Sequence, residues 1–214
     1  MKKMLVLMVM VTLCGSTAAW SVDTYDYTAD FAASFTGGEG GVPANPYGVW
    51  EYGYYDIGET TTWNLYSEVA PVIGLNVWRY PGDYDTYGNA AYNTNDSDVD
   101  GSSYSDDGLY WRTHGASWMI SAWGLDQYQP GGRFIAPVSG TYDIAISFIN
   151  NVPCGDSTGV YVNINDVQDF SAVVSGFNDG VTDLASYSKS VYLAQGQTVT
   201  FGNFRDTSVD INEN

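Results

Sequence analysis

The chain has 214 residues, of which 25 are acidic and 7 basic, and its formal net charge is −18 at pH 7. A surface this acidic repels the phosphates of nucleic acids and anionic membranes, so we expect neither as a partner. Tyrosine (18 copies) and tryptophan (7 copies) are abundant, and glycine, asparagine, aspartate and serine recur at short intervals. This composition is typical of an all-β domain.

Residues 1–19 predict a secretory signal peptide. Lys2 and Lys3 are followed by the apolar run Met4–Leu13, and small residues lead to a cleavage site after Ala19. The run is shorter than the ~20 residues of a membrane span, and no second run follows. We therefore expect a secreted, extracellular protein without membrane insertion.

Cleavage would leave residues 20–214 as a single domain with a net charge of 5 − 25 = −20, because two of the seven basic residues are lost. Cys154 would be the one remaining cysteine, so an intrachain disulfide is excluded. The stability of the domain must then come from a buried core.

The mature chain opens with Asp26–Phe35, which we interpret as the first strand. In Val49–Tyr54 the residues alternate, so that Trp50, Tyr52 and Tyr54 share one face of a strand. Large aromatic side chains are mostly buried, which favours a core-facing ladder. The alternative is a platform on which Tyr52 and Tyr54 stack against sugar rings.

Further strands are expected at Trp63–Tyr66 and Val72–Trp78. The next stretch, Tyr80–Asp107, is rich in Tyr, Asp, Asn, Ser and Gly and has few aliphatic residues. A long stretch of this kind in a compact domain is usually functional or disordered.

This stretch contains a candidate metal-binding loop with the sequence DSDVDG and a further acid at its twelfth position. Alternating carboxylates on a tight turn converge on one hard cation, so the motif predicts Ca²⁺ as a cofactor. It departs from an EF-hand in its serine at position eight, its final aspartate and its lack of flanking helices. The alternative is a solvated acidic loop. The candidate ligands are Asp96, Asp98, Asp100 and Asp107.

Residues 108–125 hold three tryptophans and His114, the one histidine of the chain. The pattern suggests two short strands on either side of His114-Gly115. Seven tryptophans are more than one core of this size readily buries, so we expect an exposed ring here on a binding face. The candidate ligand-binding residues are Trp111, Trp118 and Trp123.

The most regular pattern of the chain is Arg133–Phe148. Pro137 and Gly140 interrupt it, and from Tyr142 to Phe148 apolar residues occupy every second position. This pattern predicts a strand, a turn and a second strand with one face on a core, which we interpret as a hairpin.

The C-terminal part predicts a strand at Gly159–Ile164 and a turn at Asn165-Asp166. Ser186–Leu193 and Thr198–Phe204 are expected to pair with each other, and Val209 and Ile211 to close the fold. The fold class predicted from these patterns is an antiparallel, two-sheet, jelly-roll-like β-sandwich.

Three segments resemble a group of secreted bacterial domains found in planctomycete-type and PEP-CTERM-sorted proteins. The first segment, NPYGVWEYGY, is similar to the group's opening, NPNGVWSYGY. The second, GRFIAPVSGTY, is similar to the group's VVRFTAPAAGTYTISGSF. The third, LAQGQTVTF, is similar to the group's LAAGDTVDF. The resemblance implies a jelly-roll-like sandwich similar to carbohydrate-binding modules, without known catalytic residues. The second half also resembles TNF-like jelly rolls. The chain carries no PEP motif, apolar helix or basic tail after residue 211, which departs from the sorted proteins.

The chain contains no zinc-protease motif, phosphate-binding loop or dinucleotide fingerprint. We interpret it as a non-catalytic binding module for glycans or cell-surface polysaccharides. One alternative is a structural or matrix protein that associates with itself or with surface polymers. Another is a glycoside hydrolase or polysaccharide lyase that uses an unidentified pair of carboxylates.

Overall fold

The computed structural model describes twelve segments of the chain, and all structural statements below concern them. They are residues 10–13, 23–35, 43–56, 62–72, 75–79, 89–92, 99–100, 111–112, 117–120, 128–149, 157–175 and 184–205.

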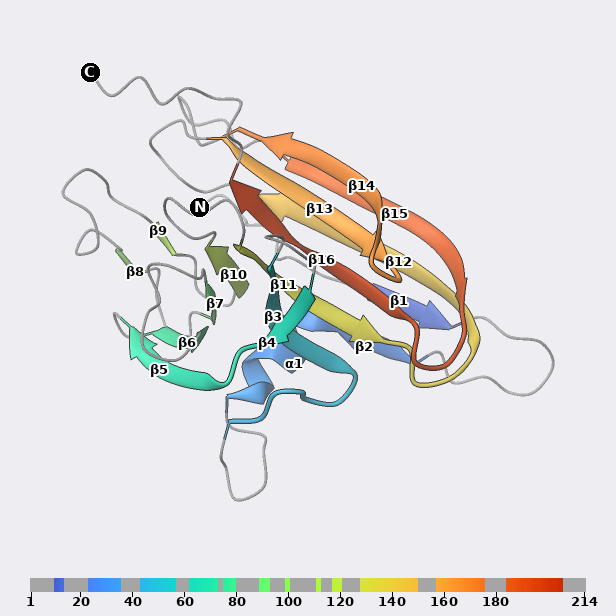
Figure 1. The fold of residues 1–214 in the computed structure, drawn as a ribbon, viewed down its shortest axis with the longest axis horizontal. Coiled ribbons are helices and arrows are strands. Elements are labelled where there is room, and N and C mark those ends of the chain that lie inside the picture. Colours follow the sequence, from blue (N-terminus) through green and yellow to red (C-terminus); the bar gives the residue numbers. More distant parts are fainter. Residues whose placement is uncertain are drawn as a thin grey trace, which may run out of the picture.

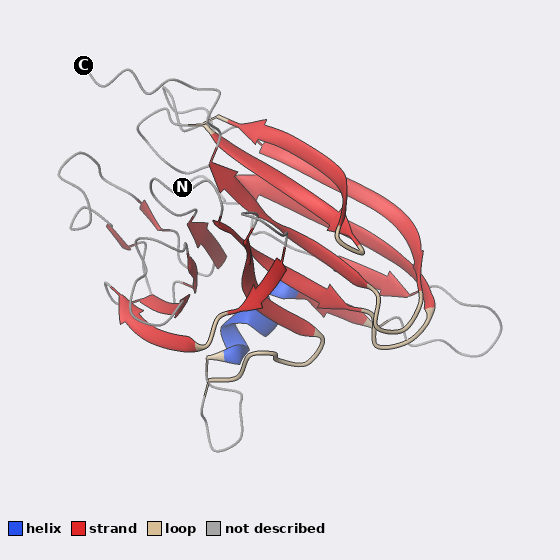
Figure 2. Ribbon diagram, viewed as in Figure 1, coloured by secondary structure: helices blue, strands red, loops and turns tan. Residues whose placement is uncertain are grey.

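The fold is an all-β antiparallel sandwich, as predicted (Figures 1 and 2). The described residues also include one short helix, which was not predicted. Its largest part is a six-stranded sheet. In spatial order this sheet consists of β14 (Val167–Val174), β13 (Thr158–Ile164), β16 (Thr198–Arg205), β11 (Tyr128–Ile135), β3 (Trp50–Asp56) and β4 (Thr62–Leu65).

The second layer is a four-stranded sheet in which β12 is paired on both sides. Its order is β15 (Leu184–Leu193), β12 (Gly140–Ile149), β1 (Met10–Leu13) and β2 (Thr24–Asp26). Strand β1 lies within the segment predicted to be a signal peptide. Cleavage after Ala19 stays a prediction, and it would remove β1 from between β12 and β2.

Two small sheets are formed by the segments between β4 and β11. One has the order β10 (Ser117–Ile120), β7 (Asn89–Tyr92), β6 (Leu75–Arg79) and β5 (Glu68–Val72), and the other joins β8 (Val99–Asp100) to β9 (Trp111–Arg112). The predicted single strand Val72–Trp78 is wrong, because Val72 pairs with Leu75 and the chain reverses between β5 and β6.

The core is predominantly aromatic and lies between the two main sheets. The alternation predicted from Tyr142 to Phe148 is confirmed, since all four apolar residues are at most 8% exposed. Opposite them, the six-stranded sheet contributes Trp50, Phe134 and Phe201, which are buried to 1% exposure or less. These rings pack mostly edge to face, the arrangement that their quadrupoles favour.

The first predicted strand, Asp26–Phe35, is wrong, because Tyr27–Ser34 form the helix α1. The Asp26 side chain caps its N-terminus and accepts hydrogen bonds from the backbone N–H groups of Thr28 and Ala29. Tyr27, Phe31 and Phe35 recur every four residues, which places them on one buried face of a helix. Tyr27 packs edge to face against both Trp50 and Phe201.

The predicted hairpins at residues 133–148 and 186–204 are also wrong in their pairing. β11 belongs to the six-stranded sheet and β12 to the other sheet, so their connection crosses between layers. The same is true of β15 and β16, because β15 pairs with β12 while β16 pairs with β11 and β13. The alternating pattern predicted these strands correctly, but it does not indicate which strands pair with each other.

No helix of the described residues is long and apolar enough to cross a membrane. The predicted closing residues Val209 and Ile211 lie outside the described segments.

Candidate functional site

A row of three glycines crosses the outward face of the six-stranded sheet. Gly53, Gly131 and Gly202 lie directly opposite one another on β3, β11 and β16. A methyl group on any of them would come within 2.1, 2.5 and 2.0 Å, respectively, of a carbonyl oxygen on a neighbouring strand. No side chain fits at these positions, so the sheet has no side chains of its own along this row.

Aromatic rings from neighbouring positions of the sheet lie against this row of glycines. The ring of Trp63, on β4, is 3.0 Å from the place that a methyl group at Gly53 would take. The hydroxyl of Tyr161, on β13, is 2.8 and 2.6 Å from the corresponding places at Gly131 and Gly202. The Tyr55 ring lies between the other two, with its centroid 5.2 Å from that of Trp63 and 6.0 Å from that of Tyr161.

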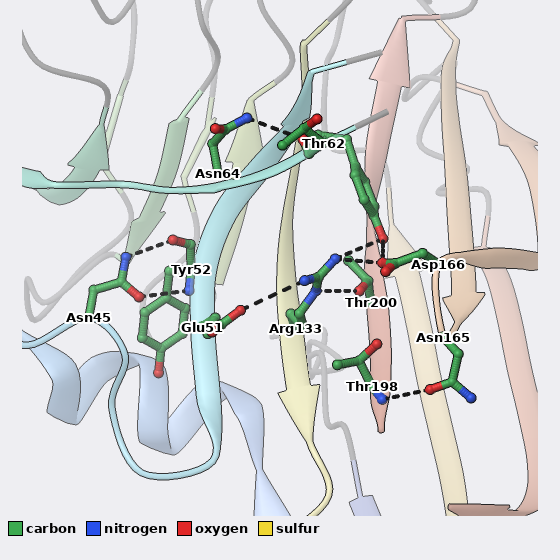
Figure 3. Close-up of polar contacts among 11 residues, drawn as sticks. Asn45, Glu51, Tyr52, Thr62, Asn64, Arg133, Asn165, Asp166, Thr198 and Thr200 are labelled. Atoms are coloured by element: carbon green, nitrogen blue, oxygen red, sulfur yellow. Dashed lines mark hydrogen bonds and ion pairs between the residues drawn. The ribbon is translucent and has the colours of Figure 1, made fainter. Parts of the chain in front are cut away.

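Arg133, on β11, joins these rings to polar groups (Figure 3). Its Nε donates to Oγ1 of Thr200 at 3.0 Å, and its Nη2 donates to the hydroxyl of Tyr55 at 3.1 Å and to Oδ1 of Asp166 at 2.6 Å. The guanidinium carbon also lies 4.5 Å from the centroid of the Trp63 ring, which is a cation–π distance. We call Glu51, Tyr55, Trp63, Arg133, Tyr161 and Asp166 the Arg133 cluster.

Asp166 reaches Arg133 from the tight turn between β13 and β14. The predicted turn at Asn165-Asp166 is confirmed, and both residues have positive φ angles of 51° and 62°. Asn165 fixes the turn, because its side chain accepts from the N–H of Thr198 while its own N–H donates to the Thr198 carbonyl, each at 2.9 Å. The turn thus holds a carboxylate over the sheet face.

The tyrosines of the cluster are buried, Arg133 and Glu51 are largely buried, and Asp166 is exposed. Tyr55 and Tyr161 are only 1% and 2% exposed. Burial is the main cause that raises the pKa of Tyr161 well above its usual value, and the nearby Tyr55 adds to it. The Tyr161 side chain therefore stays a neutral phenol. The side chains of Arg133, Glu51 and Asp166 are 12%, 19% and 57% exposed.

Several polar atoms of this face have capacity for a ligand. Among the described residues, Nη1 of Arg133 makes only the long ion pair with Glu51, at 4.0 Å. Two buried atoms have no hydrogen-bond partner in the described segments. They are Nε1 of Trp63 and Oδ1 of Asn163, which lies opposite Thr200 on β13. A guanidinium donor, two carboxylate acceptors and a half-buried indole ring therefore lie together on one sheet face.

The predicted aromatic platform on β3 faces the core instead. Tyr52 is fully buried and Tyr54 is 5% exposed, so neither ring lies open to a ligand, and the core-facing ladder is what the structure contains. Tyr52 packs against Phe31 of α1 with ring centroids 4.7 Å apart.

The predicted tryptophans are only partly placed. Trp111 lies on β9 and Trp118 on β10, where the structure describes the backbone alone, and Trp123 lies outside the described residues. Their role in ligand binding stays a prediction.

The predicted calcium ligands Asp96, Asp98 and Asp107 also lie outside the described residues. Asp100 is in β8, opposite Trp111 of β9. Within the described segments, no three His, Cys, Asp or Glu residues gather at one place that could hold a metal ion.

Sequence reasoning missed the Arg133 cluster. Its residues come from β3, β4, β11, β13 and the turn after β13, and the glycine row is visible only once the strand register is known. Neither a family model nor a curated protein sequence matches this chain.

Proposed function

We propose that this protein is a secreted, non-catalytic module that binds a glycan on the outward face of its six-stranded sheet. The observation that carries the proposal is the contact between Arg133 and Trp63 above the glycine row, with carboxylates on both sides of the guanidinium group. An aromatic ring offers an apolar surface to the C–H faces of a sugar. Charged hydrogen-bonding groups beside it suit the sugar hydroxyls.

The ligand that fits this site best is an uncharged polysaccharide. The one guanidinium group of the cluster already lies between Glu51 and Asp166, so the site has no surplus positive charge. The net charge of −18 also repels polyanions over the whole surface. We therefore expect neutral glycans to bind in preference to uronic-acid or sulfated ones.

The test is a glycan-array screen of the secreted protein, with calcium and with chelator, followed by calorimetric titration of the best neutral oligosaccharide. Trp63→Ala should weaken binding about tenfold, which corresponds to ~1.4 kcal/mol. Glu51→Gln should weaken binding while leaving the fold intact, because this carboxylate makes only the 4.0 Å ion pair within the described part of the chain.

The matched control is Val138→Ala, which shortens a 48% exposed side chain in the connection between β11 and β12 and should leave binding unchanged. The absence of any glycan ligand, or full affinity in the Trp63→Ala variant, would contradict the proposal.

A further inference from the structure

Strand β15 is a long strand at the edge of the four-stranded sheet as the structure describes it. All ten of its residues, Leu184–Leu193, pair with β12 in an uninterrupted antiparallel register. No strand of the described residues pairs with its other side. Figure 1 shows β15 at the margin of the sandwich, next to β14.

Natural edge strands usually carry features that prevent pairing with other chains, such as bulges, prolines or charges. The neighbouring edge, β14, has an irregular register opposite Val162 and Asn163, and it carries Asp169. β15 has no bulge, no proline and no acidic residue, although the chain has 25 acids.

The single charge of β15 is already balanced. Lys189 forms an ion pair with Asp169 of β14, and the Tyr187 hydroxyl donates to the same carboxylate at 2.7 Å. The edge is therefore electrically neutral in a strongly acidic chain. Two copies that meet at this edge avoid the repulsion that separates them elsewhere.

The sequence of β15 is LASYSKSVYL. If two copies of this strand pair antiparallel with Ser188 at the centre, residues of similar character lie opposite each other. Its outward-facing residues are all exposed, and they are Leu184, Ser186, Ser188, Ser190 and Tyr192. In this register Ser188 meets its own copy, Ser186 meets the partner's Ser190, and Leu184 meets the partner's Tyr192. On the other face Ala185 meets the partner's Val191.

We propose that two copies of the chain pair through β15, antiparallel about a two-fold axis at Ser188, so that their four-stranded sheets become continuous. The pairing adds a ladder of backbone hydrogen bonds between the two edges. It also covers the two large apolar side chains that β15 leaves in water, Leu184 at 47% and Tyr192 at 66% exposure.

The first test measures the oligomeric state by sedimentation equilibrium across a concentration series. The wild type should be a dimer. Ser188→Asp should be a monomer, because it places two carboxylates directly opposite each other on the axis. The matched control Ser171→Asp introduces the same charge at an exposed serine of β14 and should remain dimeric. Circular dichroism would establish that both variants are folded.

The second test fixes the register by disulfide cross-linking in a Cys14→Ser, Cys154→Ser background. Ser188→Cys should oxidise to a covalent dimer, since directly opposed residues lie about 4.5–5.5 Å apart at Cα, within disulfide range. Ser190→Cys should not, because its copy lies four residues further along, about 13 Å away.

A wild type that stays monomeric at concentrations on the order of 100 μM would overturn the proposal. So would a dimer that survives Ser188→Asp, or equal cross-linking at positions 188 and 190. These outcomes are independent of glycan binding, which involves the other sheet.

Discussion

The guanidinium carbon of Arg133 lies 4.5 Å from the centroid of the Trp63 ring, although β3 separates their two strands in the sheet. The contact crosses above Gly53, where a methyl group would be 3.0 Å from the indole ring and 2.1 Å from a backbone oxygen. The missing side chain at position 53 is therefore what allows an arginine and a tryptophan two strands apart to meet.

The geometry at Arg133 predicts that lysine cannot replace it. A lysine keeps the charge, but it lacks the planar fork that reaches Thr200, Tyr55 and Asp166 together. We expect Arg133→Lys to lower the free energy of unfolding by about 1–3 kcal/mol in urea titrations. A lysine variant as stable as the wild type would show that the three hydrogen bonds contribute little.

A second prediction concerns Asn45, whose side chain bonds to the backbone of Tyr52 (Figure 3) and also to that of Tyr66. Its Nδ2 donates to the carbonyls of Tyr52 and Tyr66, each at 2.7 Å, and its Oδ1 accepts from the N–H of Tyr52 at 2.9 Å. Asn45→Ala should cost about 2–3 kcal/mol, because the Tyr52 N–H and the Tyr66 carbonyl both lose this partner. The Tyr52 carbonyl still accepts from the Tyr66 N–H.

The control for Asn45 is Asn64→Ala. Asn64 makes one exposed hydrogen bond, to the Thr62 carbonyl at 3.1 Å. Its loss should change stability by less than about 0.5 kcal/mol. Equal effects of the two substitutions in chemical denaturation would disprove the special role of Asn45.

The third prediction is a pH dependence from Asp169. Hydrogen bonds from Lys189 and then Tyr187 lower the pKa of Asp169 below its usual value of 3.8. A lowered pKa in the folded state gives stability that is present above the unfolded pKa and lost as the pH falls through the folded one. Asp169→Asn should therefore lose less stability than the wild type when melting temperatures are followed from pH 6 to about pH 2.

Asp30 should behave in the opposite way. Burial raises its pKa, although the hydrogen bond from Trp50 Nε1, at 2.8 Å, lowers it in part. The folded state then binds the proton more tightly than the unfolded state, so the ionised group destabilises the fold at neutral pH. Asp30→Asn keeps an acceptor for Trp50 and should melt above the wild type at pH 7, with the difference vanishing in acid. A melting temperature below the wild type at pH 7 would refute this.

The sequence predicted the local structure better than the arrangement of the strands. Alternation from Tyr142 to Phe148 and the turn at Asn165-Asp166 are confirmed, because both depend on residues close in the chain. The crossing from β11 to β12 could not be predicted, since a core-facing strand has the same pattern in either sheet. The helix α1 was missed although Tyr27, Phe31 and Phe35 recur every four residues, because the aromatic composition favoured a strand.

The candidate site could not be predicted from the sequence either, because it depends on which strands pair with each other. Trp63 and Arg133 are far apart in the chain, and Gly53, Gly131 and Gly202 look like ordinary turn or strand glycines until β3, β11 and β16 are aligned. Tyr52 and Tyr54, by contrast, alternate with the residues that face outward, and their burial follows from that pattern.

The final prediction is that the acidic segment binds Ca²⁺. Asp96, Asp98, Asp100 and Asp107 place four carboxylates within twelve residues, and a divalent cation relieves their mutual repulsion. Oxygen ligands and a glycine-containing loop suit calcium better than zinc. Binding to the folded state alone adds ~2.7 kcal/mol to the free energy of unfolding when free calcium is about a hundred times its dissociation constant. Millimolar calcium should therefore raise the melting temperature above that in chelator.

The double substitution Asp98→Ala plus Asp100→Ala should abolish this rise. Asp23→Ala plus Asp143→Ala, which removes equal charge from exposed positions, should preserve it. Identical melting temperatures of the wild type in calcium and chelator would rule the site out.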